Sequence, residues 1–301
     1  MTESTEPAAP LVAPRTQPHS GGLFAPPRRA LVIGLLLTIT LVAFESLAVA
    51  TVMPVVKDDL GGLALYGWVF SGFFLASLAG IEVAGQLADR RGLHLPYTAS
   101  LVVFVGGLAI AAFAPSMPVL VAGRILQGFG AGAIPSMGYV AIGRGLPEHL
   151  RPRMFAALST AWVLPGLVGP AVASLIEHVA SWRWVFGALV PVVVIAGAMT
   201  APALKALDAM APITDAPAFD RRRLGVVGAL VVGVGMALSA GDATWFLALG
   251  LAVAGIPLGV WAFTRLQPRG TVRLAPGVPA TVAVRGLLTW AFFGADAYVS
   301  L

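Results

Sequence analysis

The sequence predicts an all-α protein that crosses a membrane several times. Of its 301 residues, 58% are hydrophobic and only 11% are charged, whereas a soluble domain carries about 25% charged residues. Several apolar runs reach the roughly 20 residues that a helix needs to cross a bilayer. Because so few charges cannot cover a water-exposed surface, we expect lipid to cover most of the molecule.

Nine such runs follow a polar tail. Residues 1–29 are rich in proline, alanine, serine and threonine and lack periodicity, so we expect a disordered cytoplasmic tail and not a cleavable signal. The predicted spans cover residues 30–56, 66–87, 95–114, 117–143, 152–176, 182–203, 224–241, 243–264 and 283–301. The polar connection 204–223 separates six spans from three. We interpret it as a cytoplasmic linker that follows an N-terminal six-helix bundle, residues 30–203.

The basic residues predict which side of the membrane each connection faces. With the N-terminus in the cytoplasm, only Lys57 and Arg183 lie in outer segments, and Arg124 lies within a span. The others lie in inner segments: Arg15, Arg28, Arg29, Arg90, Arg91, Arg144, Arg151, Arg153, Lys205, Arg221, Arg222, Arg223, Arg265, Arg269, Arg273 and Arg285. This bias follows the positive-inside rule, so we expect a multi-pass protein of a bacterial-type plasma membrane. The net charge of +5 then gives no support to nucleic-acid binding.

Side chains that carry covalent or metal chemistry are scarce. The chain has no cysteine, which excludes disulfides and thiolate metal sites. Its histidines are far apart in the sequence, at His19, His94, His149 and His178. We therefore expect no metal site, no cofactor and no enzymatic activity.

Four short motifs carry a resemblance to a known family. They are FESLAVATVMP at residues 44–54, GQLADRRG at 85–92, RILQGFGAG at 124–132 and GLVGP at 166–170. The glycines and charges of the second motif suit a tight cytoplasmic turn between the second and third spans. In this order, the four motifs resemble those of the major facilitator superfamily, a family of membrane transporters.

Two of these motifs resemble those of particular branches of the family. GLVGP resembles the antiporter motif, and FESLAVATVMP resembles an acidic motif of the 14-helix drug/proton exporters. Some residues depart from the family pattern: Leu93 and His94 replace two basic residues, Pro165 a glycine, Ala173 and Ser174 a glycine pair, and Glu45 an aspartate. The motifs cover residues 30–203, and the remaining spans fit by their pattern alone.

The resemblance implies a fold of two six-helix bundles around a central cavity. The 14-helix branch inserts two helices between the bundles, and residues 224–264 would supply them. Residues 283–301 would then be the first helix of a truncated second bundle, so we expect the chain to be the N-terminal part of a longer transporter. The connection after the eighth span lacks a second copy of GQLADRRG, which favours fourteen helices over twelve.

The resemblance also implies an activity, the proton-coupled export of small organic, drug-like molecules by alternating access. The expected partners are a small-molecule substrate, protons and membrane lipid; the expected state is a monomer, and the proton gradient takes the place of a cofactor. Two alternatives stay open. One is uptake or symport by a member of the same superfamily, and the other is a membrane fragment that does not transport.

Three charged residues within predicted spans are candidates for proton coupling. Glu45 lies roughly 22 Å along its helix from residue 30, at the cytoplasmic face. Arg124 lies about 10 Å inside its span from the outer face, so the two residues lie at comparable depths in the membrane. Charges at that depth should face protein or water, so we expect electrostatic coupling between the two. Asp296 occupies a corresponding place in the ninth span. The alternative is that Glu45 only keeps a cavity wet and Arg124 only joins helices by hydrogen bonds.

The remaining candidates belong to the motifs. The candidate gate residues are Gly85, Asp89, Arg90 and Gly92, with an ordinary basic loop as the alternative. The candidate hinge of the antiporter motif is formed by Pro165, Gly166, Gly169 and Pro170, with simple helix packing as the alternative. The span-four motif contributes Arg124, Gln127, Gly128 and Gly132. For Glu82, near the inner end of the second span, we expect contact with headgroup water and no special role.

Overall fold

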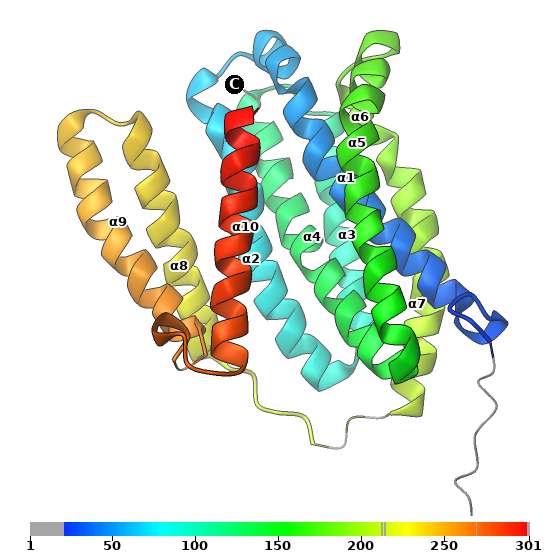
Figure 1. Ribbon diagram of the computed structural model, residues 1–301. Coiled ribbons are helices and arrows are strands. Elements are labelled where there is room, and N and C mark those ends of the chain that lie inside the picture. Colours follow the sequence, from blue (N-terminus) through cyan, green and yellow to red (C-terminus); the bar gives the residue numbers. More distant parts are fainter. Residues whose placement is uncertain (1–20, 212, 214, 269, 300–301) are drawn as a thin grey trace, which may run out of the picture.

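The computed structural model describes residues 21–211, 213, 215–268 and 270–299, and most of these residues are helical (Figure 1). The helices are α1 (Pro26–Leu60), α2 (Tyr66–Arg91), α3 (His94–Ala112), α4 (Met117–Gly145), α5 (Arg151–Val179), α6 (Arg183–Gly187), α7 (Leu189–Met210), α8 (Arg221–Ser239), α9 (Trp245–Leu266) and α10 (Val278–Val299). They run up and down in one bundle, with α8 and α9 on one flank. The predicted all-α fold is confirmed.

Eight spans in the described part of the chain are long and apolar enough to cross a membrane. They comprise α1 to α5, the pair α6 and α7 taken together, α8 and α9. The ninth predicted span, residues 283–301, lies largely within α10, but residues 300–301 and most side chains beyond Leu288 fall outside the described residues. That α10 crosses the membrane stays a prediction.

The connections alternate between two ends of the bundle. At the lower end in Figure 1, α2 joins α3, α4 joins α5, α7 leads to α8 and α9 leads to α10. The arginine-rich segments of the sequence belong to these connections, so we call this end the basic end. The other connections lie at the opposite end, which holds far fewer basic residues.

Two predicted boundaries differ from the structure. Helix α1 begins at Pro26, within the predicted tail, because proline is well suited to the first turn of a helix; residues 1–20 of that tail are outside the described residues. Helix α7 continues to Met210 and α8 begins at Arg221, so residues 204–210 and 221–223 of the predicted linker 204–223 are helical. The buried side chain of Leu204 holds this part of α7 against the bundle.

The predicted span 182–203 is interrupted. The structure divides it into α6, which ends at Gly187, and α7, which begins at Leu189. Pro191 lies four residues after Gly187. Proline has no N–H to donate to the carbonyl of Gly187, and its ring also crowds that carbonyl. The proline therefore explains why the helix breaks at Ala188.

Helix α4 packs against its neighbours at the level of the backbone. A Cβ atom on Gly128 would overlap the backbone of Phe73, and one on Gly132 would overlap that of Ser77, both on α2. On the other side of α4, Gly130 approaches Ser100 of α3. Because lipid supplies no hydrophobic force between helices, such close contacts are a main source of their association. The span-four motif is thus a packing motif as well as the carrier of Arg124.

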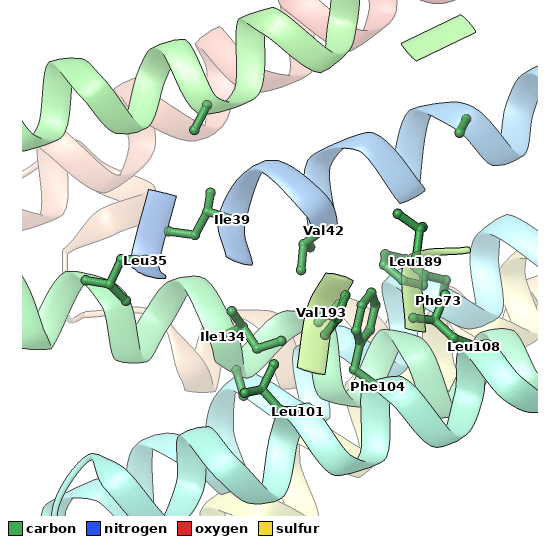
Figure 2. Packing of buried hydrophobic residues seen from close by; sticks show 14 of the residues in the cluster. Leu35, Ile39, Val42, Phe73, Leu101, Phe104, Leu108, Ile134, Leu189 and Val193 are labelled. Carbon is green, nitrogen blue, oxygen red and sulfur yellow. The ribbon is translucent and has the colours of Figure 1, made fainter. Parts of the chain in front are cut away.

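Apolar side chains from α1, α3, α4 and α7 fill the interior (Figure 2). Gly138 of α4 leaves room for Leu35 and Ile39 of α1. At the opposite end, the Asp59 carboxylate of α1 accepts hydrogen bonds from Trp182 Nε1 at 3.0 Å and Arg183 Nη1 at 2.8 Å. These bonds fasten the end of α1 to the start of α6, beside the apolar interior.

Helices α8 and α9 form a separate pair. Gly233 of α8 faces Gly255 and Gly259 of α9 so closely that no Cβ atom fits on Gly233 or Gly255. Toward the rest of the bundle, α8 contacts α2. In the described part of the chain, the pair is therefore attached to the first six spans through α2.

The packing of α4 makes a testable prediction. Gly128→Ala should lower the free energy of unfolding by about 1–3 kcal/mol, because the backbone of α2 must move to accept the new methyl group. Gly143 lies on the same helix with open space around it, so Gly143→Ala should be neutral or stabilising by up to about 1 kcal/mol. Thermal unfolding of the two variants in the same detergent measures the difference. Equal midpoints would contradict the role assigned to Gly128.

Candidate functional site

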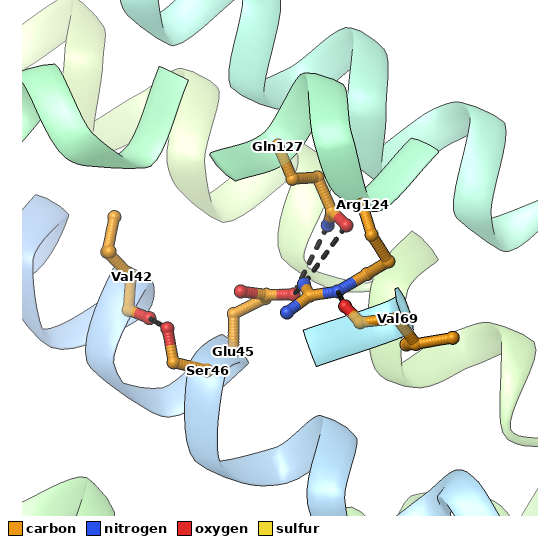
Figure 3. Close-up of polar contacts among 6 residues, drawn as sticks. All are labelled: Val42, Glu45, Ser46, Val69, Arg124 and Gln127. Carbon is orange, nitrogen blue, oxygen red and sulfur yellow. Dashed lines mark hydrogen bonds and ion pairs between the residues drawn. The ribbon is translucent and has the colours of Figure 1, made fainter. Parts of the chain in front are cut away.

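A buried ion pair joins α1 to α4. Glu45 and Arg124 are 0% and 1% exposed, and Arg124 Nη1 donates to Glu45 Oε1 (Figure 3). Removing two charges from water is costly, and their attraction offsets that cost only when further hydrogen bonds satisfy them. The structure thus brings together the two residues whose coupling the sequence predicted.

Further contacts complete the surroundings of Arg124. Its Nε donates to the carbonyl of Val69 on α2 at 3.1 Å, and its Nη1 donates to Gln127 Oε1 at 3.1 Å. The guanidinium carbon also lies 4.2 Å from the centre of the Phe73 ring, a favourable cation–π distance. Arg124 therefore connects α1, α2 and α4 through one planar group.

The two oxygens of Glu45 have different surroundings. Oε1 accepts from Arg124 and from Gln127 Nε2, the latter at 3.3 Å. Oε2 is buried and accepts no hydrogen bond from the described residues. An ionised carboxylate prefers several donors, and a buried acceptor without one is costly. Oε2 is consequently the atom of this site at which a proton can be held without displacing the arginine.

A second buried polar group lies two helical turns before Glu45 on α1. Thr38 Oγ1 and the Tyr97 hydroxyl of α3 are 2.9 Å apart, and Thr38 also donates to the carbonyl of Gly34 at 2.7 Å. Thr200 of α7 is fully buried nearby, close to Gly34. This group could not be predicted from the sequence, because single threonines and tyrosines are common in apolar helices.

The candidate gate differs from the predicted tight turn. Residues 85–91 continue α2, and only Gly92, with φ of 81°, has a turn conformation. Gly85 has open space around it, so its position requires neither a turn nor a close approach. Asp89 and Arg90 are exposed, and the Arg90 guanidinium lies 5.7 Å from the centre of the Phe219 ring. The turn between the second and third spans is therefore present but confined to the end of the motif, while the gating role stays a prediction.

The turn is held by a residue that the sequence placed in the linker. Asp208 of α7 accepts hydrogen bonds from the backbone N–H groups of Leu93 and His94, both at 2.8 Å. These N–H groups begin α3 and have no partner within that helix. A side chain on Gly92 would collide with the Asp208 carboxylate. The motif thus requires glycine at this position for two reasons, its backbone angle and this contact.

Polar contacts also join α2 to the start of α8. Gln86 Oε1 accepts from the N–H of Asp220 at 2.9 Å, and Gln86 Nε2 donates to the carbonyl of Asp220 at 3.3 Å. Glu82 pairs with Arg223 at 2.8 Å and accepts from Gln86 Nε2 at 2.9 Å. Glu82, for which the sequence predicted contact with headgroup water, thus also pairs with an arginine that α8 brings to it.

The two glycines of the antiporter motif, Gly166 and Gly169, lie near side chains of α1. Helix α5 continues through both prolines, with Pro165 and Gly169 buried and Gly166 and Pro170 exposed. A Cβ atom on Gly169 would lie 3.7 Å from the ring of Phe44, the residue before Glu45. The motif therefore packs against α1 beside Phe44, while a hinge movement stays a prediction. Asp296 lies in α10, and its side chain falls outside the described residues.

Comparison with known sequences gives a consistent family match. Residues 35–212 match the family model described as Major Facilitator Superfamily. The multidrug transporter protein MdtP of Bacillus subtilis (strain 168) is 28% identical over 253 residues, which are 83% of this chain and 46% of that protein. The probable multidrug-efflux transporter Rv1634 of Mycobacterium tuberculosis (strain ATCC 25618 / H37Rv) is 29% identical over 219 residues, 73% of this chain and 44% of that protein. The chain thus spans less than half the length of these relatives.

Solved structures of transporters share the fold. The POT family transporter PepTSo superimposes with a TM-score of 0.53 at 15% identity, covering 80% of this chain and 55% of that one. The partially occluded inward-open xylose transporter XylE from E. coli gives 0.52 at 14% identity, covering 85% of this chain and 79% of that one. At such identities the likeness concerns the fold alone.

The ion pair makes a prediction about stability. Glu45→Leu and Arg124→Leu should each lower the free energy of unfolding by about 3–5 kcal/mol, because each leaves one buried charge without its partner. The double variant should recover a large part of that loss, since neither charge remains. Thermal unfolding of the four proteins gives the coupling energy. If the two losses simply add, the pair is not the interaction described here.

Proposed function

Because this chain belongs to the major facilitator superfamily, a family of transporters and not of enzymes, we propose that it acts in secondary active transport. The proposed activity is the export of small organic, drug-like molecules in exchange for protons, by alternating access. The multidrug transporters of Bacillus subtilis and Mycobacterium tuberculosis named above support the substrate class. The resemblance of residues 166–170 to an antiporter motif supports the direction of transport.

The observation that carries the proposal is the unequal bonding of the Glu45 carboxylate. Oε1 holds Arg124 in place, while Oε2 accepts no hydrogen bond from the described residues. When a proton binds Oε2, the net charge of the site changes and the attraction for Arg124 weakens. Arg124 also bonds to Val69 on α2, so a change in the pair is transmitted to a third helix. Proton binding can in this way favour one arrangement of the helices over another.

The proposed location is a bacterial-type plasma membrane with the basic end in the cytoplasm. The concentration of arginines at that end supports this orientation through the positive-inside rule. The proposed working state is a monomer, and the proton gradient supplies the driving force without a cofactor.

The orientation is tested by cysteine labelling, for which the chain is suited because it has no cysteine. Leu63 lies exposed in the α1–α2 connection at the opposite end, and Met210 lies exposed at the end of α7 at the basic end. In intact cells, a membrane-impermeant maleimide should label Leu63→Cys and should label Met210→Cys only after the cells are opened. Labelling of Met210→Cys alone in intact cells would reverse the proposed orientation.

The proposed activity is tested by dye efflux from cells that express the gene encoding this chain. A protonophore should abolish efflux, and Glu45→Gln should lower proton-driven efflux at least about 10-fold, because the amide cannot take up a proton. Glu148→Gln is the matched control, since Glu148 is exposed at the basic end and lies outside the site. Accumulation of the dyes instead of loss would indicate uptake. Efflux that survives both the protonophore and Glu45→Gln would refute the proton coupling.

A further inference from the structure

A cavity lined by arginines lies at the basic end of α8 and α9. Its volume is about 780 Å³, and it lies between the start of α8, the end of α9 and the connection that leads to α10. Arg222 and Arg223 come from the first turn of α8, Arg265 from the last turn of α9, and Arg273 from a short 3-10 helix, Thr271–Arg273. These segments converge at the foot of the pair in Figure 1. We call this cavity the arginine pocket.

The charges of the arginine pocket are not balanced. Asp220 is the one acid among the described residues that line it, and its Oδ1 already caps α8 by accepting from the N–H of Arg223 at 2.9 Å. Arg223 is paired with Glu82 of α2. For Arg222, Arg265 and Arg273, no carboxylate of the described residues lies within 4.0 Å. Three guanidinium groups therefore border a cavity without a protein counter-ion.

The depth of the pocket matches the level of lipid headgroups. Helices α8 and α9 are both long and apolar enough to be spans, and the arginines stand at their ends. The wall toward the membrane interior is formed by Val226, Ala229 and Trp261. The pocket thus changes from cationic to apolar along the direction in which a phospholipid lies.

The surface beyond the pocket continues the apolar part. Val232 of α8 and Val253 and Val260 of α9 are more than half exposed, and in the described part of the chain α9 packs chiefly on α8 and the short connection between them. Acyl chains can lie along this surface while a phosphate occupies the pocket. A free phosphate would leave the apolar wall without a use. The geometry therefore favours an amphipathic anion over a soluble one.

We propose that the arginine pocket binds the phosphate headgroup of an anionic phospholipid in the leaflet at the basic end, with the acyl chains along α8 and α9. Guanidinium groups suit this ligand because they donate in pairs to phosphate oxygens. Basic pockets between membrane helices are a known type of site for anionic lipids. This site does not depend on transport, so it stands or falls separately from the proposed function.

Native mass spectrometry of the purified protein tests the site with phosphatidylglycerol and phosphatidylcholine of the same acyl chains. The triple variant Arg222→Gln/Arg265→Gln/Arg273→Gln should bind phosphatidylglycerol about 100-fold more weakly, since each interfacial arginine contributes about fivefold. Its binding of phosphatidylcholine should not change. The matched control is Arg29→Gln/Arg144→Gln/Arg153→Gln, which removes the same charge from exposed arginines elsewhere at the basic end. An equal loss in both triple variants would overturn the proposal.

A second variant keeps every charge and fills the space instead. Gly225 lines the pocket, and a Cβ atom there meets nothing within 4 Å, so Gly225→Phe should fold normally and still weaken phosphatidylglycerol binding. This variant decides the question if the triple variant does not fold. Glycerol 3-phosphate is added in competition to test for a soluble ligand. If it displaces the lipid at equal concentration, the pocket is a site for soluble phosphates and the lipid assignment is wrong.

Discussion

The cost of holding charge away from water determines the centre of this structure. Glu45 and Arg124 lie within spans, where neither can be hydrated and each is stabilised chiefly by the other. The ion pair between these two residues joins α1 to α4, and the hydrogen bond from Arg124 to the Val69 carbonyl joins α2 to them. The glycines of α4 then allow α2 and α3 to approach at backbone distance. The polar pair and the close packing are thus two parts of one arrangement.

The sequence predicted the helices, their alternation and the depth of the two charged residues, because each of these follows from composition and helical rise. It did not show which face of α1 or α4 each residue occupies, since facing depends on tertiary packing. Contacts made by residues that belong to no motif could not be predicted from the sequence either. Asp208 was assigned to the linker, yet its carboxylate caps the start of α3. The break at Ala188 has a visible cause in the sequence, Pro191, but proline also occurs within continuous helices such as α5, so its presence alone did not predict a break.

At the basic end, residues 85–92 are connected to the rest of the bundle less by their exposed charges than by the hydrogen bonds that Gln86 and the turn after Gly92 make. Asp208 fixes the turn after Gly92, and Gln86 bonds to both backbone groups of Asp220. Asp208 lies near the end of α7 and Asp220 directly before α8, so the two aspartates stand at the two ends of the connection between these helices. A movement of α2 at this end must therefore either carry that connection with it or break these bonds. The connection is mechanically linked to the motif, although it lies more than a hundred residues away in the sequence.

Arginine occupies two different depths in this protein, and the same physics governs both. Arg124 lies within the hydrocarbon region, where an unpaired charge is very costly, and it has a carboxylate, a carbonyl, an amide and an aromatic ring as partners. Arg222 and Arg265 stand at helix ends, where water and headgroups are in reach and a protein counter-ion is not required. Depth alone therefore decides whether an arginine must find its partner within the protein or is left able to find one in the membrane.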